Sequence, residues 1–128
     1  MSLDRIRLAS LHDKVMNAEQ AAAFIQDGMT VGMSGFTRAG EAKAVPLALV
    51  KRAKADPLKI TLITGASLGN DLDKQLTEAG VLARRLPFQV DNTLRKAINN
   101  GEVMYIDQHL SETVEQMRNK QLKKPDIA

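Results

Sequence analysis

Residues Val31–Pro46 read VGMSGFTRAGEAKAVP and contain the pattern that decides the fold. A short apolar run leads into a loop that contains three glycines, Gly32, Gly35 and Gly40. Glycine lets a ligand or another backbone segment approach the main chain closely. Pro46 falls in the first turn of the next expected helix, whose free N–H groups and positive dipole end face back toward the loop. This arrangement predicts an anion site at the end of a strand, for a phosphate or a carboxylate.

The clearest strand is KITLIT at Lys59–Thr64, which is short, apolar and rich in β-branched residues. Few charges interrupt it, as expected for a strand that is covered on both faces. It leads into a second glycine loop, GASLGN at Gly65–Asn70. Because ligands bind at the carboxyl ends of parallel strands, we expect both glycine loops at one edge of a sheet.

The remaining patterns alternate between helix and strand. Asn17 and Gln20 have the spacing of a capping box, and Asp71 is expected to cap a later helix. In the last predicted helix, Val114 and Met117 are expected to face inward. The predicted helices are Asp4–Ala9, Ala18–Gln26, Val45–Lys54, Leu72–Ala79, Thr93–Asn99 and Ser111–Leu122, and the predicted strands are Thr30–Met33, Lys59–Thr64, Val81–Leu86 and Glu102–Ile106. The order predicts an α/β fold with a mainly parallel sheet and helices on both faces.

Composition narrows the possible functions. The chain has 128 residues, of which 44% are hydrophobic and 26% charged, as in an ordinary globular domain. The absence of cysteine excludes disulfides, a thiol nucleophile and thiolate metal sites, and it fits a cytoplasmic location. No apolar run is long enough to span a membrane, and the N-terminus does not have the pattern of a secretory signal. We therefore expect no membrane partner.

The charge of +3 raises the question of nucleic acid, because the basic residues gather at Arg118–Lys124. Aromatic residues make up only 3% of the chain, so few side chains are available to stack on bases. A solvated helix face and tail account for the cluster, and no nucleic-acid partner is expected. At Asp126–Ala128 the pattern resembles the start of a further strand, which predicts that the chain is an N-terminal piece of a larger domain.

Four motifs together resemble the acetyl-CoA hydrolase/transferase family, which includes succinyl-CoA:acetate and propionyl-CoA:succinate CoA-transferases. The motifs are GMTVGMSGFTRAGEAKAVPLAL at Gly28–Leu49, LITGAS at Leu62–Ser67, PFQ at Pro87–Gln89 and YIDQHLS at Tyr105–Ser111. They occur in the family's order and cover essentially the whole chain. Relatives commonly read GYPK where this chain has Gly40–Lys43, GEAK, so the loop lacks an aromatic residue and a proline.

The resemblance implies that residues 1–128 are the first part of the first of two CoA-transferase-type domains. It implies an enzyme that moves CoA between small carboxylates such as acetate, succinate and propionate, with CoA as a substrate and no permanently bound cofactor or metal. A glutamate would attack the acyl-CoA thioester and become a glutamyl-CoA thioester. In the family this glutamate lies in the second domain, so we expect no catalytic residue in this chain. The full-length protein is expected to be a homodimer, and this piece alone to be inactive.

The resemblance also places one wall of an acyl pocket on the two glycine loops. Ser67, together with Gly65 and Ala66, is expected to hold the substrate carboxylate through its hydroxyl and neighbouring backbone N–H groups. The alternative is that Ser67 only caps the following turn. Gly35 and Phe36 are the second candidates, with Phe36 beside the acyl group; the alternative for Phe36 is a core aromatic.

Other polar residues have simpler interpretations. Glu41 lies beside the first glycine loop and is expected to be a solvated loop carboxylate. Asp107 and His109 have no third ligand at a zinc spacing, and a structural hydrogen bond is expected instead. Arg38 and Lys43 are expected at the surface, where they either attract anionic substrates or have no specific role.

Two other functions remain open from the residues alone. The glycine loops suggest a phosphate- or nucleotide-binding α/β module without catalysis, although neither has the spacing of a P-loop or of a dinucleotide-binding fingerprint. A non-catalytic interaction domain, in which the basic tail binds an acidic partner, is the other alternative.

Overall fold

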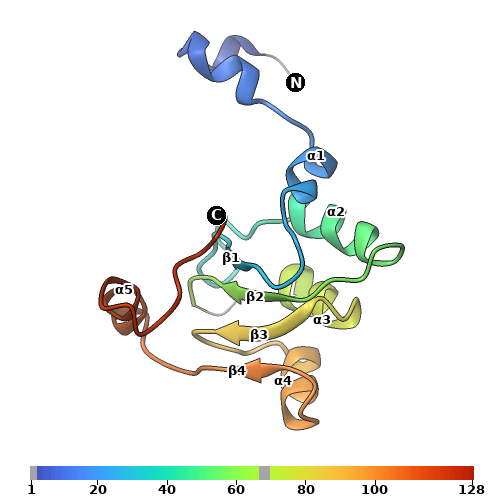
Figure 1. The fold of residues 1–128 in the computed structure, drawn as a ribbon, viewed down its shortest axis with the longest axis vertical. Coiled ribbons are helices and arrows are strands. Elements are labelled where there is room, and N and C mark those ends of the chain that lie inside the picture. The colour runs from blue at the N-terminus through green and yellow to red at the C-terminus, as the bar shows by residue number, and fades with distance from the viewer. Residues whose placement is uncertain (1–2, 67–69) are drawn as a thin grey trace.

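Four parallel strands form the centre of the structure, a computed structural model that describes residues 3–66 and 70–128. Their order in the sheet is β1-β2-β3-β4, the same as their order in the chain (Figure 1). The strands are β1 Thr30–Gly32, β2 Ile60–Ile63, β3 Leu82–Leu86 and β4 Met104–Tyr105. The α/β class and the parallel sheet are therefore as predicted, and each strand lies within its predicted range.

The register of the strands separates the two faces of the sheet. Val31 pairs with Leu62, and Leu62 pairs with Arg85, so these side chains share one face. All three are buried. On the opposite face Arg84 pairs with Met104, and both are exposed. The first face is the one that the helices cover.

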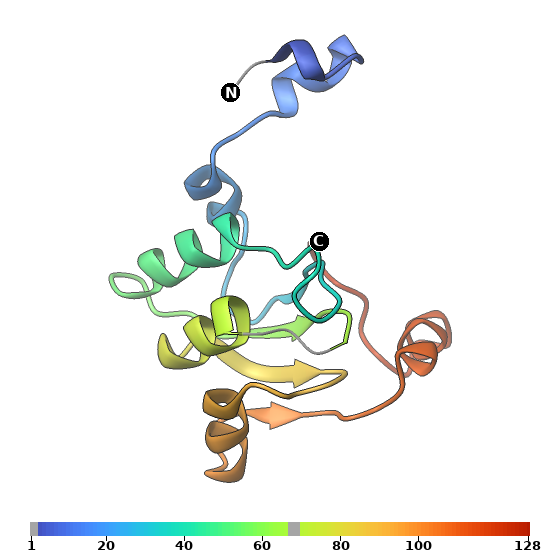
Figure 2. The ribbon, with the colours of Figure 1, turned by 180° about the vertical axis from the view of Figure 1, so that it is seen from behind.

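The helices are unevenly distributed around the sheet. Helices α1 to α4 pack one against the next on one side of the strands, and α5 lies apart, beyond the carboxyl ends of β3 and β4 (Figures 1 and 2). The α-helices are α1 Ala18–Ala23, α2 Ala44–Ala53, α3 Gln75–Glu78, α4 Asn92–Asn99 and α5 Leu110–Arg118. The second face carries less helical cover than the sequence predicted.

Local capping signals account for where several helices begin. The capping box is present at α1, where the Asn17 side chain accepts from Gln20 N and the Gln20 side chain accepts from Asn17 N. Asp91 caps α4 by accepting from Leu94 N at 2.9 Å. Pro46 lies in the first turn of α2, as predicted.

Two details in helices near the start and the middle of the chain differ from the predictions, and a third, in α5, follows. The expected helix Asp4–Ala9 is replaced by short 3₁₀ turns at Leu3–Arg5 and Ala9–Lys14, in a segment that is mostly exposed and lacks the packing that stabilises a short helix. Asp71 lies inside a π-helical turn, Asn70–Lys74, that precedes α3, and the N-cap position of α3 is taken by Lys74 instead.

In α5 it is Thr113 that faces inward, with 4% of its surface exposed, whereas Val114 is 52% exposed. The Thr113 hydroxyl accepts a hydrogen bond from Gln108 Nε2 at 3.0 Å, which turns this side of α5 toward the loop after β4. Met117 is half-buried, in agreement with its expected inward orientation.

The C-terminal residues pair with the free edge of β1. Ile127 forms a parallel bridge with Val31, and Gly32 N donates to Ile127 O at 2.8 Å. Asp126 contributes twice, because its N–H donates to Thr30 O at 2.7 Å and its carboxylate accepts from Thr30 N at 2.8 Å. The strand-like pattern at the end of the chain is therefore confirmed as a pairing segment next to β1.

Candidate functional site

The two glycine loops lie together at the carboxyl edge of the sheet, as the sequence predicted. The first glycine loop, residues 34–43, follows β1, and Gly65 and Ala66, which begin the second glycine loop (residues 65–70 of the sequence), follow β2. Because β1 and β2 are adjacent and parallel, their ends bring the loops to the same edge. The predicted site residues Gly35, Phe36, Gly65 and Ala66 all lie here. Ser67 lies outside the described residues, so its placement stays a prediction.

The contact between the loops is made by backbone atoms. Thr37 N donates to Ala66 O at 2.8 Å. The carbonyl oxygen of Gly35 lies where a side chain at position 65 would begin, so only glycine fits at Gly65 without a backbone shift. Gly35 itself has φ 141°, which also favours glycine. Two of the glycines that define the loops are thus required by this contact.

The first glycine loop forms a tight turn at its tip. Phe36 and Ala39 exchange backbone hydrogen bonds of 3.0 and 2.9 Å, and Ser34 Oγ donates to Gly40 O at 2.8 Å. Thr37 has φ 56°, an unusual conformation for a β-branched residue, and its bond to the second loop helps to hold it there. Phe36 is 60% exposed, so the alternative of a core aromatic is wrong.

Glu41 connects the first glycine loop to the helical segment after the second. Its Oε1 accepts a hydrogen bond from Leu72 N at 3.0 Å, and its side chain is half-buried. The expectation of a solvated loop carboxylate is therefore wrong. Local sequence patterns do not indicate this contact because its partner lies 31 positions away. Arg38 and Lys43 are exposed, as expected, and Lys43 Nζ lies 4.0 Å from Asp71 Oδ2.

Beneath the loops, Arg85 and Asp73 form an ion pair whose side chains are both fully buried. Arg85 Nε donates to Asp73 Oδ1 at 2.8 Å and Nη2 donates to Oδ2 at 3.3 Å, while Nη1 donates to Leu86 O. Burial raises the pKa of the Asp73 carboxyl above its ordinary value of 3.8, although Arg85 acts in the opposite direction. The pair joins the carboxyl end of β3 to the helical turn that Glu41 contacts.

The other two motifs meet at the ends of β3 and β4. Gln89 Nε2 donates to Arg85 O at 3.2 Å and to Ile106 O at 3.0 Å. The backbone N–H of Gln108 donates to Pro87 O at 2.9 Å. The residues of PFQ and YIDQHLS thus tie neighbouring strand ends together at the same edge of the sheet as the glycine loops.

Asp107 and His109 are both exposed, and no side-chain hydrogen bond is present for either within the described ranges. The expected structural hydrogen bond is therefore absent there, because His109 instead takes the N-cap position of α5 without a side-chain cap. In residues 3–66 and 70–128, no three His, Asp or Glu side chains are placed to hold a metal ion. In the same ranges, no helix has the length and apolar character needed to cross a bilayer.

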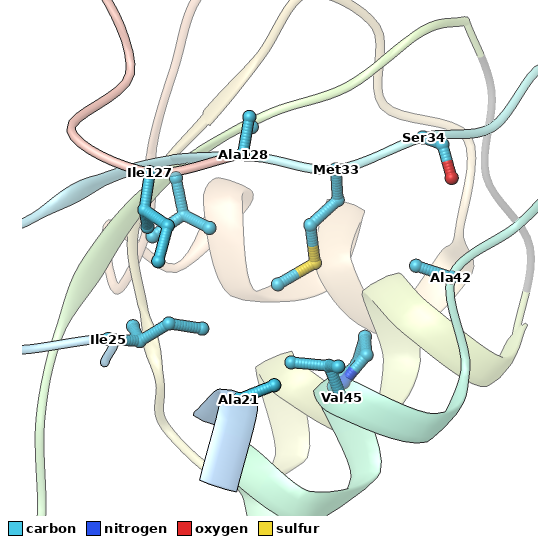
Figure 3. Close-up of a pocket in the computed structure, with 11 residues that line it drawn as sticks. Ala21, Ile25, Met33, Ser34, Ala42, Val45, Ile127 and Ala128 are labelled. Atoms are coloured by element: carbon cyan, nitrogen blue, oxygen red, sulfur yellow. The ribbon is translucent and has the colours of Figure 1, made fainter. Parts of the chain in front are cut away.

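An apolar cavity of about 320 Å³ lies next to the first glycine loop. Met33 points into it between Ile25 and Val45, and Ile127 closes another side (Figure 3). Ser34 lies at its edge, where the first glycine loop begins. The cavity lies between α1, α2 and the C-terminal residues beside β1, and its lining is mainly apolar.

A parallel sheet with helices and with glycine loops at its carboxyl edge defines an α/β domain, and solved structures with a similar fold exist. One is a variant of the decarboxylase AibA/AibB, with a TM-score of 0.64 and 19% identity over 80% of this chain and 41% of that chain. The chain belongs to the acetyl-CoA hydrolase/transferase family, whose N-terminal domain matches residues 2–127.

Two curated relatives support this assignment. The chain is 43% identical over 126 residues to succinyl-CoA:acetate CoA-transferase from Clostridium kluyveri, covering 97% of this chain and 23% of the relative. It is 44% identical over 105 residues to propanoyl-CoA:succinate CoA transferase from Escherichia coli, covering 78% of this chain and 21% of the relative. The chain thus spans less than a quarter of the length of these relatives.

Proposed function

We propose that this chain is the first part of the first CoA-transferase domain of an enzyme that moves CoA between small carboxylates of the acetate, propionate and succinate class. In the proposed route, a glutamate supplied from outside this chain attacks the acyl-CoA thioester and releases CoA thiolate, which leaves an acyl-glutamyl anhydride. The thiolate then attacks the glutamyl carbonyl, so that the carboxylate departs and a glutamyl-CoA thioester remains. An incoming carboxylate takes over the CoA by the reverse of these steps, and water in its place would make the enzyme a hydrolase.

In this proposal the two glycine loops form one wall of the acyl pocket. The observation that carries the assignment is their contact, in which Thr37 N donates to Ala66 O and Gly35 packs on Gly65. Ser67 directly follows this contact in the sequence and would bind the carboxylate through its hydroxyl. Phe36, which is exposed and directly follows Gly35, would pack against the acyl group. Free backbone N–H groups in such a wall stabilise a developing oxyanion.

The remaining features of the proposed enzyme follow from its family. Its partners would be an acyl-CoA and a small carboxylate, and CoA would act as a substrate while no cofactor is bound permanently. The full-length protein would be a cytoplasmic homodimer. The piece described by residues 1–128 would bind carboxylate weakly and would not catalyse the transfer by itself, because the nucleophile lies elsewhere.

Titration of this chain with ligands tests the proposed wall. We expect acetate, propionate or succinate to shift the backbone amide NMR signals of residues 35–39 and of Gly65 and Ala66, whereas ATP and NAD leave them unchanged. Ser67→Ala should weaken carboxylate binding, and Ser111→Ala, an exposed serine in α5, is the matched control. Shifts with ATP or NAD but not with carboxylates would instead identify a nucleotide-binding module. An absence of shifts with every ligand would contradict a carboxylate wall in this chain.

The covalent route is tested in a full-length protein that contains this chain, the rest of the first domain and the second CoA-transferase domain. Incubation with acyl-CoA should produce a glutamyl-CoA adduct that borohydride or hydroxylamine traps, with loss of activity. An active protein that yields no trapped adduct would exclude the route.

A further inference from the structure

Glu41 occupies an unusual position for a charged residue in a glycine-rich loop. Residues 36–40 are all exposed, whereas the Glu41 side chain is half-buried. Its carboxylate accepts the Leu72 N–H at 3.0 Å, and Leu72 is fully buried in the core. Within the part of the chain that the structure describes, Glu41 is the one side chain of residues 35–41 with a hydrogen bond outside the loop. A hydrogen bond to an ionised acceptor is also stronger than a neutral one.

The first glycine loop contacts the chain at the start of the second glycine loop and again just after it. At the start, Thr37 N donates to Ala66 O. After it, Glu41 binds the Leu72 N–H. The first glycine loop is therefore fixed to the chain at both ends of the second, at points six residues apart. The Lys43–Asp71 pair adds little, because its N–O distance is 4.0 Å and both side chains are well exposed.

We propose that Glu41 is a positioning residue that holds the first glycine loop against the helical turn at Leu72 and thereby fixes Gly35 and Phe36 in the proposed carboxylate wall. This inference rests on the proposed function for its ligand, whereas the loop geometry is independent of it. Glu41 acts through the Leu72 N–H and does not touch the substrate. The hydrogen bond, rather than the negative charge, is what the geometry requires, so a glutamine amide oxygen in the same place should serve.

The test compares Glu41→Ala and Glu41→Gln with Glu112→Ala, which removes an exposed glutamate in the first turn of α5. The first readout is amide hydrogen exchange, which needs no ligand. Glu41→Ala should speed exchange of the Leu72 and Thr37 amides about tenfold, since one charge-assisted hydrogen bond is lost. Glu41→Gln should stay within about threefold of the unmodified chain. Glu112→Ala should change neither amide.

The second readout is the affinity for acetate and propionate. Glu41→Ala should weaken binding about fivefold or more while the midpoint of urea unfolding stays near that of Glu112→Ala, and Glu41→Gln should restore most of the affinity. Unchanged exchange in Glu41→Ala would overturn the positioning role. An affinity loss in Glu41→Gln as large as in Glu41→Ala would overturn it as well, because charge would then be decisive. If exchange responds as expected but no variant binds carboxylate, the positioning role stands and the proposed function fails.

Discussion

Replacing Gly65 by alanine tests the contact between the glycine loops most directly. An added Cβ would meet the Gly35 carbonyl, with the carbonyl carbon at 3.2 Å and Phe36 Cα at 3.9 Å. All of these are backbone atoms, so no side-chain rotation relieves the clash and the loops must move apart. Overpacking of this kind costs about 1–3 kcal/mol. Loss of the neighbouring Thr37–Ala66 hydrogen bond adds about 0.5–1.5 kcal/mol.

Gly32→Ala is the matched control for this substitution. A Cβ there would lie 3.2 Å from Ala128 Cβ and 3.3 Å from Pro125 Cγ, which are side-chain atoms of the C-terminal segment and can shift slightly. Neither glycine has a positive φ, so the entropy that alanine removes from the unfolded chain, about 0.4–1 kcal/mol, is the same in both variants and cancels in the comparison.

Urea unfolding followed by circular dichroism measures the difference. With a slope of about 1.5 kcal/mol per molar, we expect the midpoint of Gly65→Ala to fall roughly 1 to 3 M below that of Gly32→Ala. Hydrogen exchange should show faster exchange of the Thr37 amide in Gly65→Ala alone. Equal midpoints for the two variants would refute the loop contact, and with it the basis for placing both loops on one wall.

Two further outcomes follow from buried and tethered charges. Arg85→Met should lower the free energy of unfolding by about 3–5 kcal/mol, because Asp73 is left buried without its partner. A second substitution, Asp73→Leu, should recover much of this loss. Equal stability of the single and double variants in urea would contradict this expectation. The hydrogen bond from Lys123 has the larger effect and that from Thr30 N the smaller one, and together they lower the pKa of Asp126 below its ordinary value of 3.8. Pairing of the C-terminal residues with β1 should therefore be stable above about pH 4 and weaken as the pH falls through the lowered pKa. The chemical shift of the Thr30 amide should change with pH through this transition, and the change should disappear in Asp126→Asn. If the substitution leaves the transition unchanged, another group is responsible for it.

Local patterns predicted most of the secondary structure because they depend on neighbours in the sequence. The capping box at Asn17 and the β-branched strand within Lys59–Thr64 are satisfied by residues within a few positions. The same patterns placed Gly35 and Gly65 at adjacent strand ends, since parallel strands deliver their loops to one edge. Failures occurred where a segment lacked such support, as at Asp4–Ala9, or where tertiary bonds fix the first helical turn, as at Asp71.

The parts of the site that the sequence did not reveal are held by long-range polar contacts. Arg85 follows another arginine in a strand, and such a pair of charges is usually typical of an exposed edge. Arg85 is buried because the Asp73 carboxylate, 12 residues earlier in the sequence, neutralises its charge and the Leu86 carbonyl accepts a further hydrogen bond. Periodicity describes which face a residue occupies, but it carries no information about which distant group will neutralise it.

Glu41 shows the same principle at the candidate site itself. A carboxylate in a loop ordinarily stays solvated, because removing it from water costs more than a weak contact returns. Here the half-buried Glu41 carboxylate accepts a hydrogen bond from the Leu72 N–H, which lies in the first turn of a helical segment and has no acceptor within that turn. One hydrogen bond therefore satisfies two polar groups, each of which would cost free energy if left buried without a partner. The core holds Leu72 in place, and Glu41 transfers that rigidity to the first glycine loop. The geometry of the proposed carboxylate wall therefore depends on a charged residue of the first glycine loop as well as on the glycines that first indicated the site.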